Sequence, residues 1–344
     1  MRRCSRTWRG VFVLAVSFLV VGCGPSPGPR LRFFASGEPG ITVVSYNVQN
    51  LFDGISQGTE YRDFDPARSD YDESQYRRRL GELAESLARS LPEPPTLLAL
   101  QEIENRQVLV DFLEAAGWSY AYEEVIFDPA RIGSVGVGLA STKPVARIRG
   151  HRPVFHGRPG RTILEVHLRE PGYADSVAGG SAAGGSAPEN SDGEARSRIV
   201  VFVNHWKSQR PTPEETEPQR RLAGRIVARR LADTPGSLSL VVGDLNTERP
   251  ALSTVRQPWE RSGVPGSYAY RGRWQRLDHI LYASDGSYEL VEFRIIRSPD
   301  ALTGEGFPKR WMPGRGGLSD HLPLFARFVR TRERSVHAQS APVE

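Results

Sequence analysis

Between residues 41 and 328, short runs of apolar residues, many of them β-branched, alternate with segments whose apolar residues recur at helical spacing. Runs of this kind are typical of buried strands. The sequence predicts strands over Ile41–Tyr46, Thr96–Leu100, Val135–Ala140, Thr162–Leu168, Ile199–Val203, Leu238–Val242, His279–Tyr282, Leu290–Ile296 and Pro323–Phe328. Because strands and helices alternate, we expect one α/β domain over residues 41–330, with many strands and few helices.

Three segments have the period of an amphipathic helix. After Ser74, apolar side chains fall on one helical face, and the pattern returns between Leu222 and Leu231 with arginines on the opposite face. The first face consists of Tyr76, Leu80, Leu83, Ala84, Leu87 and Leu91. A third, shorter helix is predicted over Arg106–Ala116.

The N-terminus has the layout of a secretory signal, with a basic start followed by the apolar run Val11–Val21. That run is shorter than the roughly 20 residues that a membrane-spanning helix needs. The residues Val20-Val21-Gly22-Cys23 resemble the bacterial lipobox, so we predict a lipoprotein signal peptide over residues 1–22, lipidation of Cys23 and a tether over residues 23–40. The alternative is that Cys23 is only a small apolar residue of the signal. A lipidated protein would be exported and anchored in a membrane of the cell envelope.

Composition narrows the possible chemistry. Removing residues 1–22 would take away four of the 45 basic residues and none of the 40 acidic ones, which leaves a formal charge of about +1. Net charge is therefore weak evidence for nucleic-acid binding. The 2 cysteines are Cys4 and Cys23, so we expect no disulfide and no thiol catalyst in the mature domain. Residues 171–198 are low in complexity and predict a flexible insertion, and residues 331–344 predict a disordered tail.

Polar and ionisable residues stand at the ends of the predicted strands. Each alone has an ordinary structural explanation, as a turn residue, a helix start or a strand cap. Together they place functional groups where buried strands reach a common rim, which is the usual position of a site in an α/β protein. They are Asn47, Glu102, Asn204, His205, Asp244, Asn246, Asp278, Asp320 and His321. We therefore interpret them as one shared site.

The residue types of this set define its chemistry. Glu102, Asp244 and Asp320 offer hard oxygen ligands, which favour Mg²⁺, or Mn²⁺ or Ca²⁺, over zinc or copper. His321 titrates near neutrality, and a carboxylate such as Asp278 on its other ring nitrogen would fix its tautomer. Donors for phosphate oxygens are available from Asn47, Asn246, His205 and Arg161. A metal, amide donors and an oriented histidine are the parts of a phosphodiester hydrolase.

Six motifs resemble, in order along the chain, those of the endonuclease/exonuclease/phosphatase superfamily. They are "VVSYNVQNLFD", "LLALQEIEN", "VNHWKSQ", "VVGDLNT", "RLDHILYA" and "LSDHLPL". That superfamily includes deoxyribonuclease I-like nucleases, abasic-site endonucleases, sphingomyelinases and inositol-polyphosphate phosphatases. The resemblance covers about residues 41–330 and implies a four-layer α/β/β/α sandwich of two packed mixed sheets flanked by helices.

The resemblance also implies roles for single residues. Glu102 matches the main Mg²⁺ ligand, Asn47 the asparagine beside the metal, and Asp320 a carboxylate that is sometimes a ligand. Asp244 and Asn246 match the pair that positions the attacking water and the phosphate.

Two histidines and an arginine complete the implied site. His321 matches the catalytic histidine and Asp278 the carboxylate that orients it, while His205 matches a second histidine that contacts phosphate or protonates the leaving group. Arg161 matches, more loosely, a phosphate-contacting arginine. The resemblance does not decide whether His321 acts as a base or as an electrostatic stabiliser. It also leaves open whether one metal ion or two are bound. The sequence has no counterpart of the abasic-site endonucleases' active-site tyrosine, which argues against base-damage repair.

Two loops that combine aromatic and basic residues, 267–276 and 307–317, each come just before one of the aspartates. We expect them to overhang the site, with basic groups on phosphates and rings on bases. The residues concerned are Tyr270, Arg273, Trp274, Lys309, Arg310 and Trp311. The alternative is that the tryptophans are partly buried structural anchors.

The leading hypothesis is a metal-dependent nuclease that cleaves DNA, RNA or both, exported, lipid-anchored and monomeric. A second is a phosphodiesterase or phosphatase acting on lipid headgroups or inositol phosphates, which a membrane anchor would suit. A third is a surface binding lipoprotein that kept the fold and lost catalysis.

Overall fold

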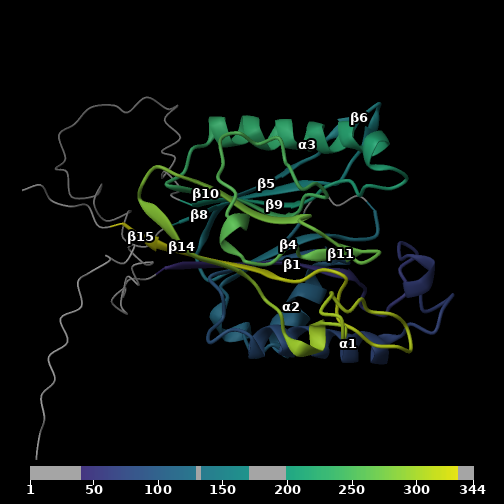
Figure 1. Cartoon of the computed structure of the whole chain (residues 1–344). Coiled ribbons are helices and arrows are strands. Elements are labelled where there is room, and N and C mark those ends of the chain that lie inside the picture. Colours follow the sequence, from purple (N-terminus) through teal and green to yellow (C-terminus); the bar gives the residue numbers. More distant parts are fainter. Residues whose placement is uncertain (1–39, 129–132, 170–198, 332–344) are drawn as a thin grey trace, which may run out of the picture. The chain divides into compact units, whose positions relative to one another are not determined.

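The apolar runs of the sequence form two β-sheets that pack face to face, with helices on both outer faces (Figure 1). The computed structural model describes residues 40–128, 133–169 and 199–331, which all fall in one compact unit of the chain. Apart from Gly40 and Thr331, the predicted signal peptide, tether, insertion and tail lie outside the described residues. No helix of the described part is both long enough and apolar enough to cross a membrane.

The first sheet has six strands in the order β14-β15-β1-β2-β4-β3. β1 and β2 run parallel, and the other neighbouring pairs are antiparallel. Its strands are β1 (Ile41–Leu51), β2 (Leu97–Ile103), β3 (Glu124–Phe127), β4 (Gly136–Ser141), β14 (Tyr288–Ile295) and β15 (Leu324–Arg330).

The second sheet has five strands in the order β13-β10-β9-β8-β5, with β9 and β10 parallel. Its strands are β5 (Val145–His151), β8 (Ile163–Leu168), β9 (Ile199–His205), β10 (Leu238–Asp244) and β13 (Asp278–Ser284). Two small hairpins accompany the sheets, β6 (Val154–Phe155) with β7 (Arg158–Pro159), and β11 (Tyr268–Tyr270) with β12 (Arg273–Gln275).

Alternation of side chains along each strand explains the layering. On β9, Val201 and Val203 point into the core between the sheets, whereas Val200 and Phe202 belong to a second cluster under helix α3. Because both faces of this sheet are covered, its central strand β9 is apolar at five successive positions, Ile199–Val203, rather than at alternate ones. The result is a four-layer α/β/β/α sandwich, as expected.

Three helices form the outer layers. α1 (Glu73–Arg89) and α2 (Arg106–Ala115) cover the six-stranded sheet, and α3 (Pro213–Asp233) covers the five-stranded sheet (Figure 1). Each starts at a side-chain cap: Asp72, Asn105 and Thr212 accept a hydrogen bond from the backbone N–H three residues later. Four 3₁₀ turns complete the described helices: Arg62–Phe64, Ser119–Ala121, Trp259–Arg261 and Pro299–Ala301.

All nine strands and all three helices predicted from the sequence are present, most with ends shifted by a few residues. β1 runs five residues past its predicted end at Tyr46, and α3 starts well before Leu222. The strands not predicted are β3, β5 and those of the two hairpins.

Candidate active site

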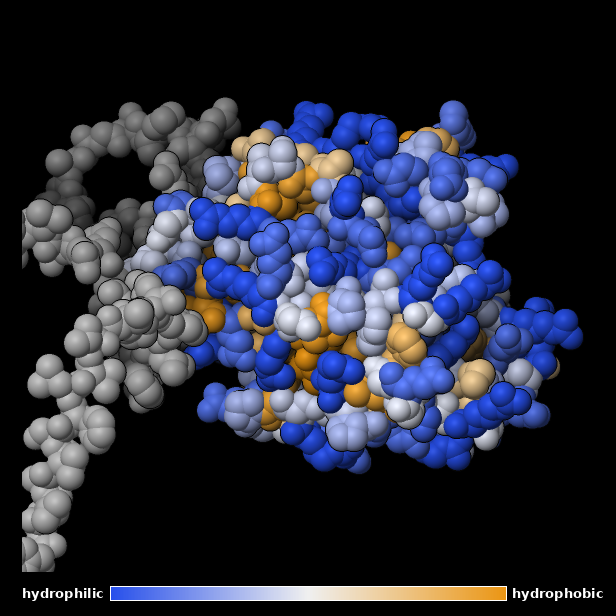
Figure 2. All heavy atoms as spheres, viewed as in Figure 1, coloured by the Kyte–Doolittle hydropathy of each residue, from blue (hydrophilic) through white to orange (hydrophobic). Residues whose placement is uncertain are grey.

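The carboxyl ends of the two parallel strand pairs meet at one end of the sandwich, where a cleft of about 510 Å³ opens. β1 and β2 bring Asn47 and Glu102 from one sheet, and β9 and β10 bring His205 and Asp244 from the other. The face seen in Figure 2 is mostly hydrophilic, with hydrophobic residues scattered among the hydrophilic ones. The strand-end residues of the sequence therefore converge in space, except Asn204, which does not line the cleft and whose side-chain oxygen accepts from the Trp206 indole N–H.

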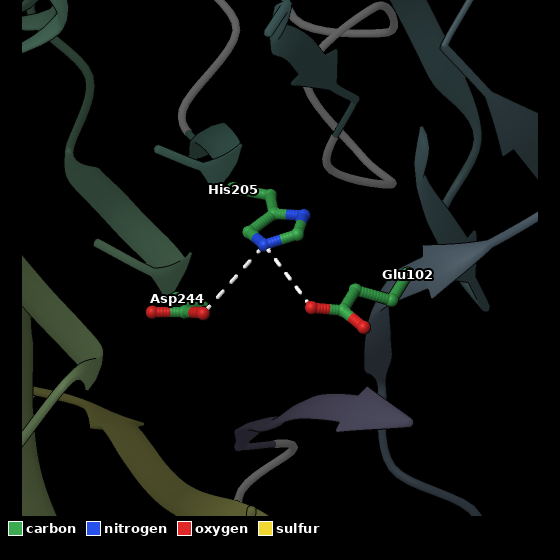
Figure 3. A group of neighbouring side chains, drawn as sticks. All are labelled: Glu102, His205 and Asp244. Carbon is green, nitrogen blue, oxygen red and sulfur yellow. Dashed lines mark ion pairs between the residues drawn. The ribbon is translucent and has the colours of Figure 1, made fainter. Parts of the chain in front are cut away.

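At the floor of the cleft, two carboxylates from different sheets share one amide. The Asn47 Nδ2 donates to Glu102 Oε1 (3.1 Å) and to Asp244 Oδ2 (3.2 Å). His205 points its Nε2 between the same two carboxylates, 3.3 Å from Glu102 Oε1 and 3.6 Å from Asp244 Oδ2 (Figure 3). The oxygen of Asn47 is used locally, because it accepts from the N–H of Gln49.

Burial sets the charge state of this group. Removal from water, together with the positive Arg161 and His321 nearby, lowers the pKa of His205 well below its usual value, so its ring is neutral. Burial raises the pKa of Asp244 to about 7; Asp278 and Glu102 add to the rise, and His321 opposes it. A buried and a half-buried carboxylate close together without a cation are costly, so this cluster has the electrostatics of a cation site.

The local backbone is bent to aim these groups. Asn50, Glu102 and Asn246 have φ of 54°, 63° and 51°, in the left-handed region that non-glycine residues rarely adopt. The bend at Asn50 directs its N–H to Glu102 Oε2 (2.9 Å). Gly243, just before Asp244, has φ of 124°, and a Cβ there would collide with the backbone oxygen of Asn204 on β9. Such outliers cluster at functional sites because the surrounding fold can hold them.

Asp244 and Asn246 form one unit at the end of β10. Asp244 Oδ1 accepts from the Asn246 N–H (2.9 Å), and Asp244 Oδ2 accepts from the Asn246 side-chain amide (3.0 Å). The same amide also donates to the backbone oxygen of Trp206 (3.1 Å), which ties the unit to the end of β9.

The second histidine stands beside this cluster and is oriented by an aspartate. His321 Nδ1 lies 2.8 Å from Asp278 Oδ2, which also accepts from the Ser267 hydroxyl (2.5 Å). Burial alone would lower the pKa of His321, but the ion pair with Asp278 and the nearby Asp244 and Asp320 outweigh it and raise the pKa to about 10. His321 is therefore an imidazolium at neutral pH, and its Nε2 lies 4.0 Å from Asp320 Oδ1 at the cleft.

Gln49 holds the segment that carries Asp320 and His321. Its Nε2 donates to the backbone oxygen of Trp311 (3.0 Å), and its Oε1 accepts from the N–H of Trp311 (3.0 Å) and of Asp320 (3.1 Å). The Ser319 hydroxyl adds a bond to the backbone oxygen of Asn47 (2.7 Å). The end of β1 and the approach to β15 are thus fixed to each other by side chains.

Three of the predicted substrate residues, Arg161, Tyr270 and Arg310, line the cleft. Arg161 also donates to the backbone oxygen of Trp206 (2.7 Å). Arg210 was not predicted, although it follows His205 closely along the chain, and it gives the cleft a third arginine.

The other predicted substrate residues, Arg273, Trp274, Lys309 and Trp311, are absent from the described wall of the cleft. Trp311 is 5% exposed and packs against Phe64 and under the Arg79 guanidinium, so the expected substrate contact is wrong for this residue. Trp274 is half-buried, packed against Phe307 and the core. For both tryptophans the structural alternative describes the observed position.

Tyr268 was missed. Its ring lies 4.7 Å from that of His321 and lines the cleft, between the end of β10 and the approach to β15. The sequence signal was present, since Tyr268 and Tyr270 share one face of a short strand and both line the cleft, but nothing in the pattern says which of them contacts the histidine.

Two groups of described residues have the spacing for a metal ion. Ligand atoms of Glu102, His205 and Asp244 lie within 4.8 Å of one another, and so do those of Asp244, Asp278 and His321. In the second group, Asp278 and His321 are already hydrogen-bonded to each other, so the first group is the better candidate for the cation site. Two carboxylates and a neutral imidazole fit a divalent cation. Asn47 faces the carboxylates with its nitrogen, so it organises this site rather than offering an oxygen.

Comparison with known proteins agrees with this geometry. The sequence profile described as "Endonuclease/Exonuclease/phosphatase family" matches residues 44–321. No curated protein matches the chain. Solved structures with the same fold include truncated TDP2 from Caenorhabditis elegans (TM-score 0.52, 16% identity, 84% of this chain and 97% of that one). The human Nocturnin catalytic domain with bound sulfate is similar, with a TM-score of 0.51 and 18% identity over 86% of this chain and 96% of that one. D. rerio TDP2 complexed with a single-strand DNA product has a TM-score of 0.52 and 14% identity over 84% of this chain and 98% of that one. The chain belongs to the endonuclease/exonuclease/phosphatase family.

Proposed function

We propose that the protein is a metal-dependent phosphodiester hydrolase and, within that class, a nuclease that cleaves DNA, RNA or both. The observation that carries the proposal is the bridged pair Glu102–Asp244, which lies beside the Asp278–His321 ion pair in one cleft. A cation site next to an oriented imidazolium is suited to a substrate with negative charge on a central phosphorus.

Glu102, Asp244 and His205 are the residues that would hold the cation, with Asp320 at the edge of the cleft as a further carboxylate. Hard oxygen donors favour Mg²⁺, with Mn²⁺ or Ca²⁺ as substitutes. When bound, such an ion supplies Lewis acidity and lowers the pKa of a coordinated water.

Residues of the chain itself would stabilise the developing charge and orient the attacking water. His321, charged and oriented by Asp278, donates from Nε2 to a phosphate oxygen and stabilises the negative charge that develops there. The Asp244–Asn246 unit lies where a water molecule can be oriented for attack. The raised pKa of His321 favours the role of electrostatic stabiliser over that of general base.

A polynucleotide fits the cleft better than a small monoester does. Arg161, Arg210 and Arg310 supply three cations around the acidic centre, and the ring of Tyr270 is 49% exposed at its rim. Arginines on phosphates with exposed aromatic rings for stacking are the usual elements of single-strand binding. The D. rerio TDP2 structure, complexed with a single-strand DNA product, supports a nucleic-acid substrate for this fold.

We further propose that the nuclease is exported and held at a membrane through lipid on Cys23, because residues 20–23 match the lipobox pattern. The protein would then degrade nucleic acid outside the cytoplasm. Cys23→Ser should move the protein from the membrane fraction to the soluble fraction. Unchanged retention in the membrane fraction would refute lipidation.

One screen tests the activity. Purified protein is offered DNA, RNA, sphingomyelin and inositol phosphates with Mg²⁺, Mn²⁺ or Ca²⁺, with and without EDTA. We expect cleavage of nucleic acid that EDTA abolishes, and a loss of about 10²–10³-fold in turnover for His321→Ala. Tyr120→Ala, at a side chain 82% exposed and outside the cleft, is the matched control. Hydrolysis of only the lipid or the inositol phosphates would replace the nuclease by the alternative substrate class.

A further inference from the structure

A second concavity adjoins the catalytic cleft on the far side of Arg161, with a volume of about 650 Å³. We call it the hairpin pocket; its walls are the β6–β7 hairpin and one face of α3, and its floor includes Trp206. The hairpin is well defined, because His156 and Gly157 at its tip both have positive φ (48° and 73°), as a tight two-residue turn requires. Its volume is in the range of pockets that hold small ligands.

The charged residues that line the hairpin pocket are all basic. Arg158, Arg161 and Lys207 contribute to it, and none of its lining residues is acidic. Phe155 and Leu222 add apolar surface on opposite walls. Basic groups beside an aromatic ring are what a nucleotide needs, with cations for its phosphate and a flat apolar face for its base.

The hairpin pocket is continuous with the catalytic cleft, and this continuity indicates which ligand the pocket binds. Arg161 lines both cavities and is held in place by its bond to the backbone oxygen of Trp206, which also accepts from Asn246 of the catalytic unit. A strand whose scissile phosphate lies at the acidic centre can continue past Arg161 into the pocket along a basic surface. We propose that the hairpin pocket is a subsite for the nucleotide adjoining the cleaved phosphodiester, an inference that rests on the nuclease activity proposed above.

Gln219 on α3 allows a test by charge alone. It is a half-buried, neutral wall residue, so Gln219→Glu and Gln219→Lys place opposite charges in the pocket with little change in size. The control is Ala232→Glu, an exposed position on the same helix about 20 Å further along, beyond the Debye length at physiological salt. Each full-length variant is assayed on a single-stranded oligonucleotide of about twelve nucleotides and on bis(4-nitrophenyl) phosphate, which has no adjoining nucleotide.

The measured quantity is the ratio of kcat/KM for the oligonucleotide to kcat/KM for the small diester. We expect it to fall about two- to fivefold in Gln219→Glu, to rise similarly in Gln219→Lys, and to stay unchanged in Ala232→Glu. Phe155→Ala should lower the ratio by about tenfold, and an abasic substrate should remove that loss if the ring stacks on a base.

The outcomes separate the two proposals. Oligonucleotide cleavage with the same ratio in both Gln219 variants would overturn the subsite and leave the nuclease standing. Hydrolysis of the small diester with no cleavage of DNA or RNA by the wild type would overturn both.

Discussion

Gln49→Met would remove three of the hydrogen bonds that fix the segment of Asp320 and His321 to β1, leaving the Ser319 bond to Asn47, with little change in side-chain shape. Methionine is unbranched and of similar length, so it tolerates the φ of 54° at this position as glutamine does. It can neither accept from the N–H groups of Trp311 and Asp320 nor donate to the backbone oxygen of Trp311.

The size of the effect follows from burial. The N–H and the oxygen of Trp311 would be left buried without a partner, and each such group costs about 1–3 kcal/mol. The N–H of Asp320 is partly exposed and can be reached by water, so it adds less. We expect the free energy of unfolding to fall by about 3 kcal/mol. Because the segment before His321 would also be free to shift, kcat should fall by about 10- to 100-fold.

Gln101→Met is the matched control. Gln101 is also fully buried at the end of the parallel pair, but its bonds go to the backbone oxygen of Ala99 and the hydroxyl of Ser45, away from the catalytic histidine. Urea unfolding and kcat are measured for both variants. Loss of stability in both with loss of kcat only in Gln49→Met supports the positioning role. Equal kcat in the two variants would refute it.

Three further changes have defined outcomes. Asp278→Asn should lower the pKa of His321 from about 10, since burial is then opposed only by the nearby Asp244 and Asp320, and an NMR titration that still finds it near 10 would contradict the ion pair. In the wild type, this raised pKa gives stability that is complete below pH 6.5 and is lost as pH rises through about 10; the variant should show a smaller loss in urea unfolding. Gly243→Ala should cost at least about 3 kcal/mol of unfolding free energy, since a Cβ there collides with β9. Glu165→Gln, which breaks a buried ion pair with Arg230 far from the cleft, should cost a similar amount in calorimetry with kcat preserved.

The strands and the catalytic set could be predicted because burial leaves a strong trace in the sequence. Central strands such as β2, β9 and β10 are covered on both faces, so they appear as mostly apolar runs with clear ends. A polar residue at the end of such a strand is held at the edge of the sheet, beside the ends of the neighbouring strands. Glu102 and Asp244, which close two of these runs, therefore meet although 142 positions separate them along the chain.

Edge strands and loops were harder to predict from the sequence. β5 is an edge strand in which Ala146, Ile148 and Gly150 are exposed, while the arginines and the histidine between them are half-buried, so its sequence lacks the apolar run of a buried strand. In the 307–317 loop, Arg310 and Trp311 are neighbours, yet one lines the cleft and the other is buried under Arg79. Composition predicts that such a loop lies near the site, but the direction of each side chain is decided by packing partners such as Phe64, which are distant in sequence.

The division of the site between two sheets has a consequence for how activity depends on stability. The Asn47 amide joins Glu102 of one sheet to Asp244 of the other, and the Asp278–His321 pair joins β13 to the segment before β15. Neither sheet alone holds a complete cation site or an oriented histidine. A slide of one sheet against the other would break both links at once, because the bonds are direct and short. The apolar contacts between the sheets therefore act as positioning elements for the chemistry, although none of them touches the cleft.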